Sequence, residues 1–228
     1  MHTTTPTSQA STTLVATPRE FGVGARLTLS VMSDDYVNVI LSAIRAADAT
    51  GLATETGAVS TYVSGGEADI LRYLSQVISA AGRAGHHVSA SLLLSRGCPG
   101  EATCELPAAG AALYSEISEL PPTGVHAVGE WALYPLADVA AASVDGNAAP
   151  DHMRDIYAAI DYAKSTGISV HTEHFVTRLE GDLAQVLQAI AAGWILVGRT
   201  VQHVATHATV SINSPSSTSP AAAAASSS

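Results

Sequence analysis

The apolar positions along the chain change their period in a regular order. Residues 24–31 alternate apolar and polar side chains, which is the period-two pattern of a half-buried strand. Residues 35–47 instead carry apolar side chains at helical spacing, and Ser33 and Asp34 precede them as candidate N-cap residues. The pattern therefore predicts a strand followed by an amphipathic helix.

A hairpin, a second helix and a further strand are predicted next. Two β-prone runs, 52–56 and 59–64, lie on either side of Gly57, as they do in a β-hairpin. Apolar positions within 70–81 then recur at helical spacing, and the run 88–94 predicts a buried strand. Together these elements form one βαββαβ unit.

The same order of elements recurs in the second half of the chain. A shift of 116 positions aligns residues 48–95 with residues 164–211 without a gap, and it superimposes Thr56 on Thr172. The first strand aligns at a shift of 104, so the second unit carries a 12-residue insertion within 137–149. This insertion falls between the first strand and the first helix of the second unit.

Two such units define the expected fold. A βαββαβ unit folds as a four-stranded antiparallel sheet of order 4-1-3-2 with both helices on one face, the ferredoxin-like arrangement. We therefore predict the α+β class, with two ferredoxin-like units in tandem. The expected boundaries are a disordered tail over 1–20, the first repeat over 21–100, a linker over 101–124, the second repeat over 125–212 and a disordered tail over 213–228.

One face of each predicted sheet has no helices and has to be covered. Either the two repeats pack face to face, or a second copy of the chain supplies the cover, and exposed edge strands offer a further route to dimers. We therefore expect a homodimer.

Composition narrows the function classes. The chain is 47% hydrophobic, enough for a real core, but its apolar stretches are too short to span a bilayer, so no membrane insertion is expected. The formal charge of −10 argues against nucleic-acid binding. The first twenty residues lack a secretory signal, and Cys98 and Cys104 are interpreted as reduced thiols, so we expect a cytoplasmic location.

A group of histidines in the second repeat invites a metal hypothesis. His171, His174, His203 and His207, with Glu173, supply metal-ligand chemistry in number. The predicted strand order places His171 and His203 at opposite edges of one sheet, roughly 14 Å apart at about 4.8 Å per strand. No metal site and no cofactor is therefore predicted.

Hydroxyl groups on the predicted hairpin are the more useful signal. Strand alternation places Ser60 on one face and Thr61 on the other, and a buried hydroxyl requires a hydrogen-bonding partner. A polar ligand is one such partner, and strand-favoured threonine on a solvent face is the alternative. No nucleophile motif, phosphate-binding loop or dinucleotide fingerprint is present in the sequence.

Several segments together carry a family resemblance. The chain resembles the YkoF family of thiamin/hydroxymethylpyrimidine-binding proteins, and the likeness covers roughly residues 22–216. This resemblance implies an ACT-like tandem repeat, a homodimer and one ligand site in each repeat, with a role in thiamin-precursor uptake or salvage and no catalysis. The segments that carry it are 24–36 (GARLTLSVMSDDY), 59–61 (VST), 95–100 (SRGCPG), 132–136 (ALYPL), 179–182 (LEGD) and 211–215 (SINSP).

The positions of these motifs suggest which residues contact the ligand. In repeat one we expect Met32 as an apolar wall and polar contacts from the helix start and the hairpin. In repeat two the insertion puts the site in doubt, and fewer positions are carried over. The expected contacts are Met32, Ser33, Asp34, Thr56, Ser60 and Thr61 in repeat one, and Tyr134, His174 and Thr177 in repeat two.

Two other functions remain open at this point. One is an enzyme that uses Asp34, Glu55 and a histidine as acid–base groups in the same cavity. The other is a regulatory module that senses a small molecule and acts on a partner protein through an exposed sheet edge. The resemblance also implies components of a thiamin-precursor transporter as partners, and the choice between thiamin, its phosphate ester and the pyrimidine precursor stays open.

Overall fold

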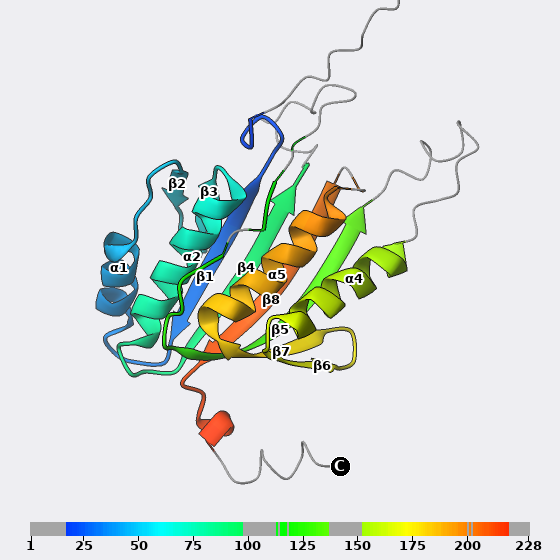
Figure 1. Cartoon of the computed structure of the whole chain (residues 1–228). Helices are drawn as coiled ribbons and strands as arrows, with labels where there is room; N and C mark the ends of the chain where they lie inside the picture. Colours follow the sequence, from blue (N-terminus) through cyan, green and yellow to red (C-terminus); the bar gives the residue numbers. More distant parts are fainter. Residues whose placement is uncertain are drawn as a thin grey trace, which may run out of the picture.

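The structure is a computed structural model that describes residues 17–97, 113, 115–117, 119–136, 152–199, 201 and 203–218. Two βαββαβ units follow one another along the chain, as Figure 1 shows. The first consists of β1 (Gly24–Val31), α1 (Tyr36–Ala46), β2 (Ala53–Thr56), β3 (Thr61–Ser64), α2 (Glu67–Gly82) and β4 (Val88–Arg96). The second consists of β5 (His126–Leu136), α4 (His152–Ser165), β6 (Ser169–Thr172), β7 (Thr177–Asp182), α5 (Leu183–Val197) and β8 (His203–Ile212).

All of these strands belong to one antiparallel sheet. Its order is β2-β3-β1-β4-β8-β5-β7-β6, so each unit has the expected ferredoxin-like order. The helices lie together on one face of this sheet (Figure 1). The predicted α+β class and tandem duplication are confirmed.

The hydrogen-bonding registers show how closely the two units match. In repeat one Gly24 pairs with Ser64 on one side and with Ser95 on the other. In repeat two Val128, which lies 104 positions further along, pairs with Glu180 and Ser211. Both partners lie 116 positions beyond those in repeat one, so the alignment made from sequence also holds in space.

The two repeats meet edge to edge through β4 and β8. Residues 88–96 of β4 pair along their whole length with residues 204–212 of β8. Leu92 pairs with Ala208, its own counterpart at a shift of 116, so a pseudo-twofold axis passes through the middle of the junction. The alternative in which the two repeats pack face to face is therefore wrong, because pairing β4 with β8 satisfies two exposed strand edges at once.

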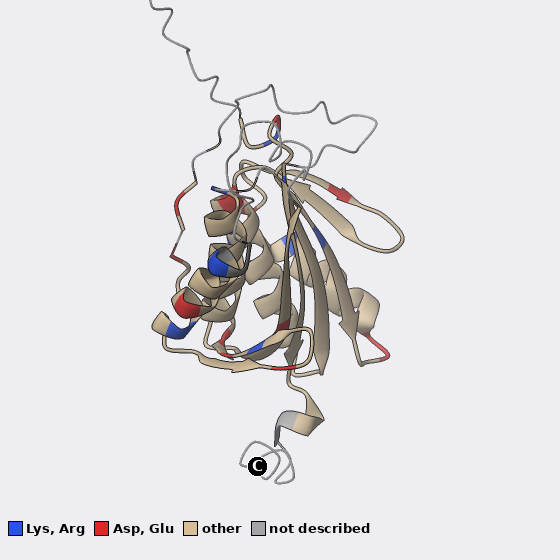
Figure 2. Cartoon of the chain, turned by 90° about the vertical axis from the view of Figure 1, so that its right-hand side faces the viewer, with Lys and Arg blue, Asp and Glu red and all other residues tan. Residues whose placement is uncertain are grey.

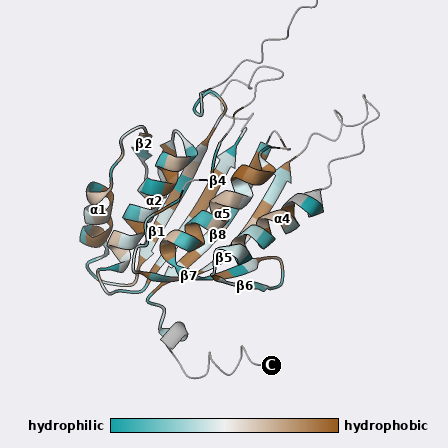
Figure 3. Ribbon diagram, viewed as in Figure 1, coloured by the Kyte–Doolittle hydropathy of each residue, from teal (hydrophilic) through white to brown (hydrophobic). Residues whose placement is uncertain are grey.

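The main core lies between the sheet and the two central helices, α2 and α5. Figure 3 shows apolar residues along α5 and along the strands beneath it. Most of α5 is buried, including Leu187, Ile190 and Trp194, whereas α1 has only Ala43 fully buried. Charged residues are few and dispersed over the ribbon (Figure 2). Among the described residues, no helix combines the length and apolarity needed to cross a bilayer.

Three local expectations differ from the structure. The N-cap position of α1 is Asp35, without a side-chain capping bond, and Ser33 Oγ instead accepts a hydrogen bond from the Asp35 amide at 3.2 Å. Residues 17–20 of the expected N-terminal tail form a turn, in which the Phe21 amide donates to the Thr17 carbonyl at 2.9 Å. At the other end, the Asn213 side chain donates to the Gly82 carbonyl at 2.8 Å.

Other expectations fall on residues that the structure does not describe. These are the insertion within 137–149, both cysteines, Cys98 and Cys104, and most of the linker and tails.

Candidate functional site

A pocket of about 410 Å³ opens in repeat one between β1, α1 and the hairpin of β2 and β3. Its position follows from the unequal lengths of neighbouring strands. β3 pairs with β1 only as far as Leu27, whereas β4 pairs with β1 as far as Val31. Among the described strands, none covers the edge of residues 28–31, and this edge forms one side of the pocket. The lining residues are Leu27, Thr28, Leu29, Ser30, Val31, Tyr36, Ile40, Leu41, Ile44, Thr56, Gly57, Ala58, Val59, Ser60 and Thr61.

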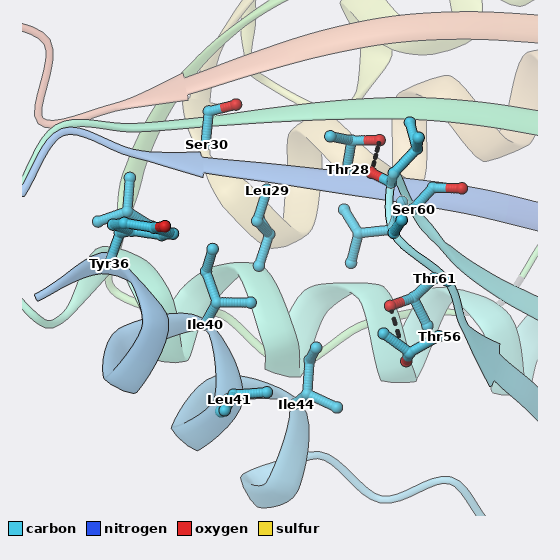
Figure 4. A pocket seen from close by; sticks show the side chains of 15 residues that line it. Thr28, Leu29, Ser30, Tyr36, Ile40, Leu41, Ile44, Thr56, Ser60 and Thr61 are labelled. Carbon is cyan, nitrogen blue, oxygen red and sulfur yellow. Dashed lines mark hydrogen bonds between the residues drawn. The ribbon is translucent and has the colours of Figure 1, made fainter.

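Aliphatic side chains from β1 and α1 form the wall of the pocket. Figure 4 shows Leu29 pointing from the strand towards Ile40 and Ile44 on the helix. The two isoleucines lie four residues apart, so one face of α1 presents both to the same space. Tyr36, the first residue of α1, closes one end.

A pair of threonines supplies the polar end of the pocket. Thr56 Oγ1 and Thr61 Oγ1 lie 3.1 Å apart across the hairpin, and Thr61 is buried. Only one of the two hydroxyls donates in that bond, so the hydrogen of the other is free to bond a ligand. Both oxygens also keep acceptor capacity.

Two other hydroxyls of the lining, those of Ser60 and Thr28, have partners already. Ser60 Oγ accepts from Arg26 Nη1 at 3.1 Å, and Thr28 Oγ1 donates to the Val59 carbonyl at 3.2 Å. Thr28 and Ser30 point to the opposite side of β1 from Leu29 in Figure 4, as strand alternation requires. These bonds hold the 57–60 turn against β1.

The structure brings together only some of the residues expected in repeat one. Thr56, Ser60 and Thr61 all line the pocket. Met32, Ser33 and Asp34 connect β1 to α1 and are not among the lining residues; Met32 and Asp34 are exposed. Ser33 Oγ instead lies 3.3 Å from His86 Nε2, and contacts from all three to a ligand stay a prediction.

Sequence reasoning missed the helical side of the pocket. Tyr36, Ile40 and Ile44 belong to the helix that was predicted, but their spacing was taken only as a sign of packing against the sheet. The feature that could have revealed this wall is the shortness of β3, which leaves part of β1 unpaired. A helix that faces an unpaired stretch of strand has apolar residues that no other element covers.

The three residues expected in repeat two do not form one cluster. Thr177 is buried and pairs with Trp131 across β5 and β7, on the helix side of the sheet. Tyr134 is exposed and lies three residues further along β5, so it points to the opposite face. His174 is exposed in the turn between β6 and β7. Their part in binding also stays a prediction.

The histidines of repeat two lie on separate strands. Within the described ranges, no three His, Cys, Asp or Glu side chains gather as a metal site would require. His171 lies on β6 and His203 on β8, at opposite edges of the second unit. Burial lowers the pKa of His203, which favours its neutral form.

Comparison with known proteins places this chain in a family. The sequence model of the YKOF-related family matches residues 22–101 and 127–217, which are the two repeats. The chain belongs to the YKOF-related family. The resemblance expected from the sequence is therefore confirmed.

One curated relative matches over most of both chains. It is the Bacillus subtilis (strain 168) protein named "Putative HMP/thiamine-binding protein YkoF", which is 27% identical over 195 residues. The match covers 85% of this chain and 91% of the relative. The pocket of this chain lies in the first of the two segments that the family model matches.

Proposed function

We propose that this YKOF-related chain binds thiamin or hydroxymethylpyrimidine without transforming it, in support of thiamin-precursor uptake or salvage. The observation that carries the proposal is the pocket of repeat one, where an unpaired strand edge, an aliphatic wall and a threonine pair converge. The printed name of the Bacillus subtilis relative supports the same ligand class.

The pocket suits a small planar ring with polar edges. Its volume of about 410 Å³ lies within the usual range for small-molecule sites, about 300–1,000 Å³. Leu29, Ile40 and Ile44 offer apolar contact to the ring faces. Backbone groups of Leu29 and Val31, which face away from β4, and the hydroxyls of Thr56 and Thr61 offer donors and acceptors to the ring nitrogens and the amino group of an aminopyrimidine.

The chemistry of the lining supports binding rather than catalysis. Among the described lining residues there is no Asp, Glu, His, Lys or Cys, and the phenol of Tyr36 is the only ionisable side chain. General acid–base catalysis needs a proton-transferring group within hydrogen-bond reach of the substrate. Glu55, one of the acid–base candidates, pairs with Tyr62 and so points to the opposite side of β2 from Thr56.

A homodimer in the cytoplasm is part of the same proposal. The helices cover one face of the sheet, and the other face carries exposed Leu93, Tyr134 and Leu136 among many hydroxyl side chains. A second copy that covers this face would bury these apolar groups. The outer strands β2 and β6 have four residues each, which makes sheet-edge docking of a partner the weaker alternative.

Isothermal titration calorimetry with thiamin and, separately, hydroxymethylpyrimidine tests the proposal. We expect saturable micromolar binding, about −8 kcal/mol at 1 μM. Ile44→Trp, which fills the pocket of repeat one, should remove that site. Ser42→Trp places the same side chain on the exposed side of α1 and serves as the control. Absence of heat with either ligand in folded protein would refute the proposed ligand class.

A further inference from the structure

Most of the exposed large apolar side chains in the described chain gather around two equivalent places. In the part of the chain that the structure describes, Leu93, Tyr134 and Leu136 are exposed on the open face of the sheet. The other exposed large hydrophobic residues lie in or beside a segment that lines the pocket (Met32, Tyr36, Val37, Leu41 and Val59) or at the equivalent place in repeat two (Tyr157 and Phe175). Scattered apolar residues are normal on a protein surface, but such a concentration marks an interaction site. This concentration therefore marks the mouth of the pocket in repeat one and the equivalent place in repeat two as candidate interaction sites.

The framework of the pocket is retained in repeat two. Ile40 and Ile44 correspond to Ile156 and Ile160 at a shift of 116 positions. Thr172 pairs with Thr177 across β6 and β7, just as Thr56 pairs with Thr61 across β2 and β3. Because the strand registers are also the same, these residues occupy the places in repeat two that correspond to the frame of the pocket in repeat one.

The place in repeat two equivalent to the mouth of the pocket has changed its chemistry. Leu41 of repeat one is replaced by Tyr157, Val59 by Phe175 and Gly57 by Glu173, and all three replacements are exposed. Two aromatic rings and a carboxylate thus stand where repeat one has aliphatic groups and a glycine. Aromatic faces beside a negative charge are the surroundings that an organic cation prefers.

Phe175 is held in an uncommon backbone conformation. Its φ of 68° is in the left-handed region, which is a genuine outlier for a bulky side chain. Phe175 is 97% exposed, whereas Val59 is 81% exposed, so no packing within the described chain compensates for this strain. Strained residues of this kind cluster at ligand clamps.

We propose that the place in repeat two equivalent to the mouth of the pocket, where Tyr157, Phe175 and Glu173 lie, binds the cationic aromatic ring of a ligand whose other ring lies among the retained residues. Repeat two then prefers a ligand of two linked rings, one of them cationic, over the neutral pyrimidine alone. Repeat one, whose lining has Tyr36 as its only aromatic ring and no carboxylate, discriminates less. This inference rests on the proposed function, since it assigns different preferences to two sites of the same ligand class.

Titration of each repeat separately tests the assignment. Ile44→Trp fills the pocket of repeat one and leaves repeat two to be measured, and Ile160→Trp does the reverse. In each background the dissociation constants of thiamin and neutral hydroxymethylpyrimidine are determined by calorimetry. We expect the preference for thiamin to be about tenfold larger in repeat two, the order expected for contacts of a cation with aromatic rings.

Exchange of the mouth residues provides matched variants. Tyr157→Leu with Phe175→Val should lower the thiamin preference of repeat two by about tenfold. The reverse exchange, Leu41→Tyr with Val59→Phe, should raise that of repeat one. Glu173→Gln should weaken thiamin binding and leave pyrimidine binding unchanged, because it removes only a charge. Circular-dichroism melting curves confirm that each variant is folded.

The outcomes separate this inference from the proposed function. If neither ligand binds the unmodified protein, the proposed function itself has failed. If the protein binds both ligands but the exchanges leave the preference unchanged, the inference is wrong and the ligand class stands. Loss of all binding in folded Ile44→Trp protein would also overturn the inference, because repeat two would then have no working site.

Discussion

At the scale of single residues, the two repeats differ most sharply at a buried ion pair. Arg96 is fully buried, and its Nη1 donates to Glu67 Oε1 at 3.1 Å. Ser115 Oγ donates to the same carboxylate oxygen at 2.7 Å, and the Phe21 ring centroid lies 5.3 Å from the guanidinium. In repeat two the equivalent positions hold Leu183 and Ile212. The same fold therefore contains a buried ion pair in one repeat and two buried apolar side chains in the other.

Removal of one partner of this pair should destabilise the fold strongly. Glu67→Leu leaves the buried Arg96 charge without its counter-charge, and we expect a loss of about 3–5 kcal/mol in the free energy of unfolding. The double variant Glu67→Leu with Arg96→Ile copies repeat two and should recover most of that loss. Urea unfolding followed by circular dichroism measures both. Equal destabilisation in the single and double variants would contradict this expectation.

At the scale of elements, the described part of the linker joins the start of α5 to the rest of the fold. Asp182 caps α5 by accepting from the Ala184 amide at 2.8 Å, and it also accepts from the Thr123 and Gly124 amides. Burial alone would raise the pKa of Asp182, but these hydrogen bonds outweigh burial and hold it below its ordinary value of 3.8. The capped form is therefore the ionised one.

This lowered pKa predicts how stability depends on pH. Because the folded pKa of Asp182 lies below the unfolded value of 3.8, its contribution is complete above that pH and is lost as the pH falls through the folded pKa. Asp182→Asn should therefore be less stable than the unmodified protein at pH 6. We expect the difference to shrink steadily below about pH 4 in urea titrations. A difference that does not change with pH would assign the role to hydrogen-bond geometry instead of charge.

At the scale of the whole molecule, the junction of β4 and β8 makes one sheet out of two units. Leu92 faces Ala208, its own counterpart, so each unit presents an edge that pairs in a symmetric register. The tandem chain thus has the geometry of a dimer of βαββαβ units whose halves are covalently linked. The open face of the continuous sheet is the surface that the proposed second copy would cover.

The symmetric register predicts what a separated first repeat would do. A polypeptide of residues 21–97 exposes the edge of β4, which β8 covers in the whole chain. We expect this polypeptide to self-associate through β4 in the same register, because an unpaired strand edge is a template for pairing. Sedimentation velocity would show the dimer, and Ala90→Pro should weaken it, because the backbone amide of residue 90 points away from β1 towards the edge that β8 covers. A stable monomeric repeat would refute this expectation.

The fold was predictable from sequence because its signals are local. Strands and helices of 4 to 16 residues carry complete periodic patterns, and the duplication presents each pattern twice. Of the candidate site, the hairpin hydroxyls of Thr56, Ser60 and Thr61 were found in this way, since their place on a short strand pair follows from alternation. The helical wall of Tyr36, Ile40 and Ile44 was missed because its role depends on where β3 ends.

Compensating changes between distant residues show why other features of the fold could not be predicted from the sequence. Trp131 stands where repeat one has Leu27, and Gly193 stands where repeat one has Val77. A Cβ added to Gly193 would lie 2.4 Å from Trp131 Cζ2, so the small residue makes room for the large one. Neither substitution is interpretable alone, and nothing in local sequence links positions on β5 and α5.

The sequence by itself determined the two βαββαβ units, their alignment and the family, because hydrophobic periodicity and repetition are properties of neighbouring residues. Tertiary structure alone decided that β4 pairs with β8 edge to edge and that an unpaired stretch of β1 opens the pocket of repeat one. It also decided that the Arg96 charge is buried beside Glu67. These features depend on contacts between residues that are far apart in the chain. The free energy of such contacts is set by burial and strand pairing, which the local sequence does not show.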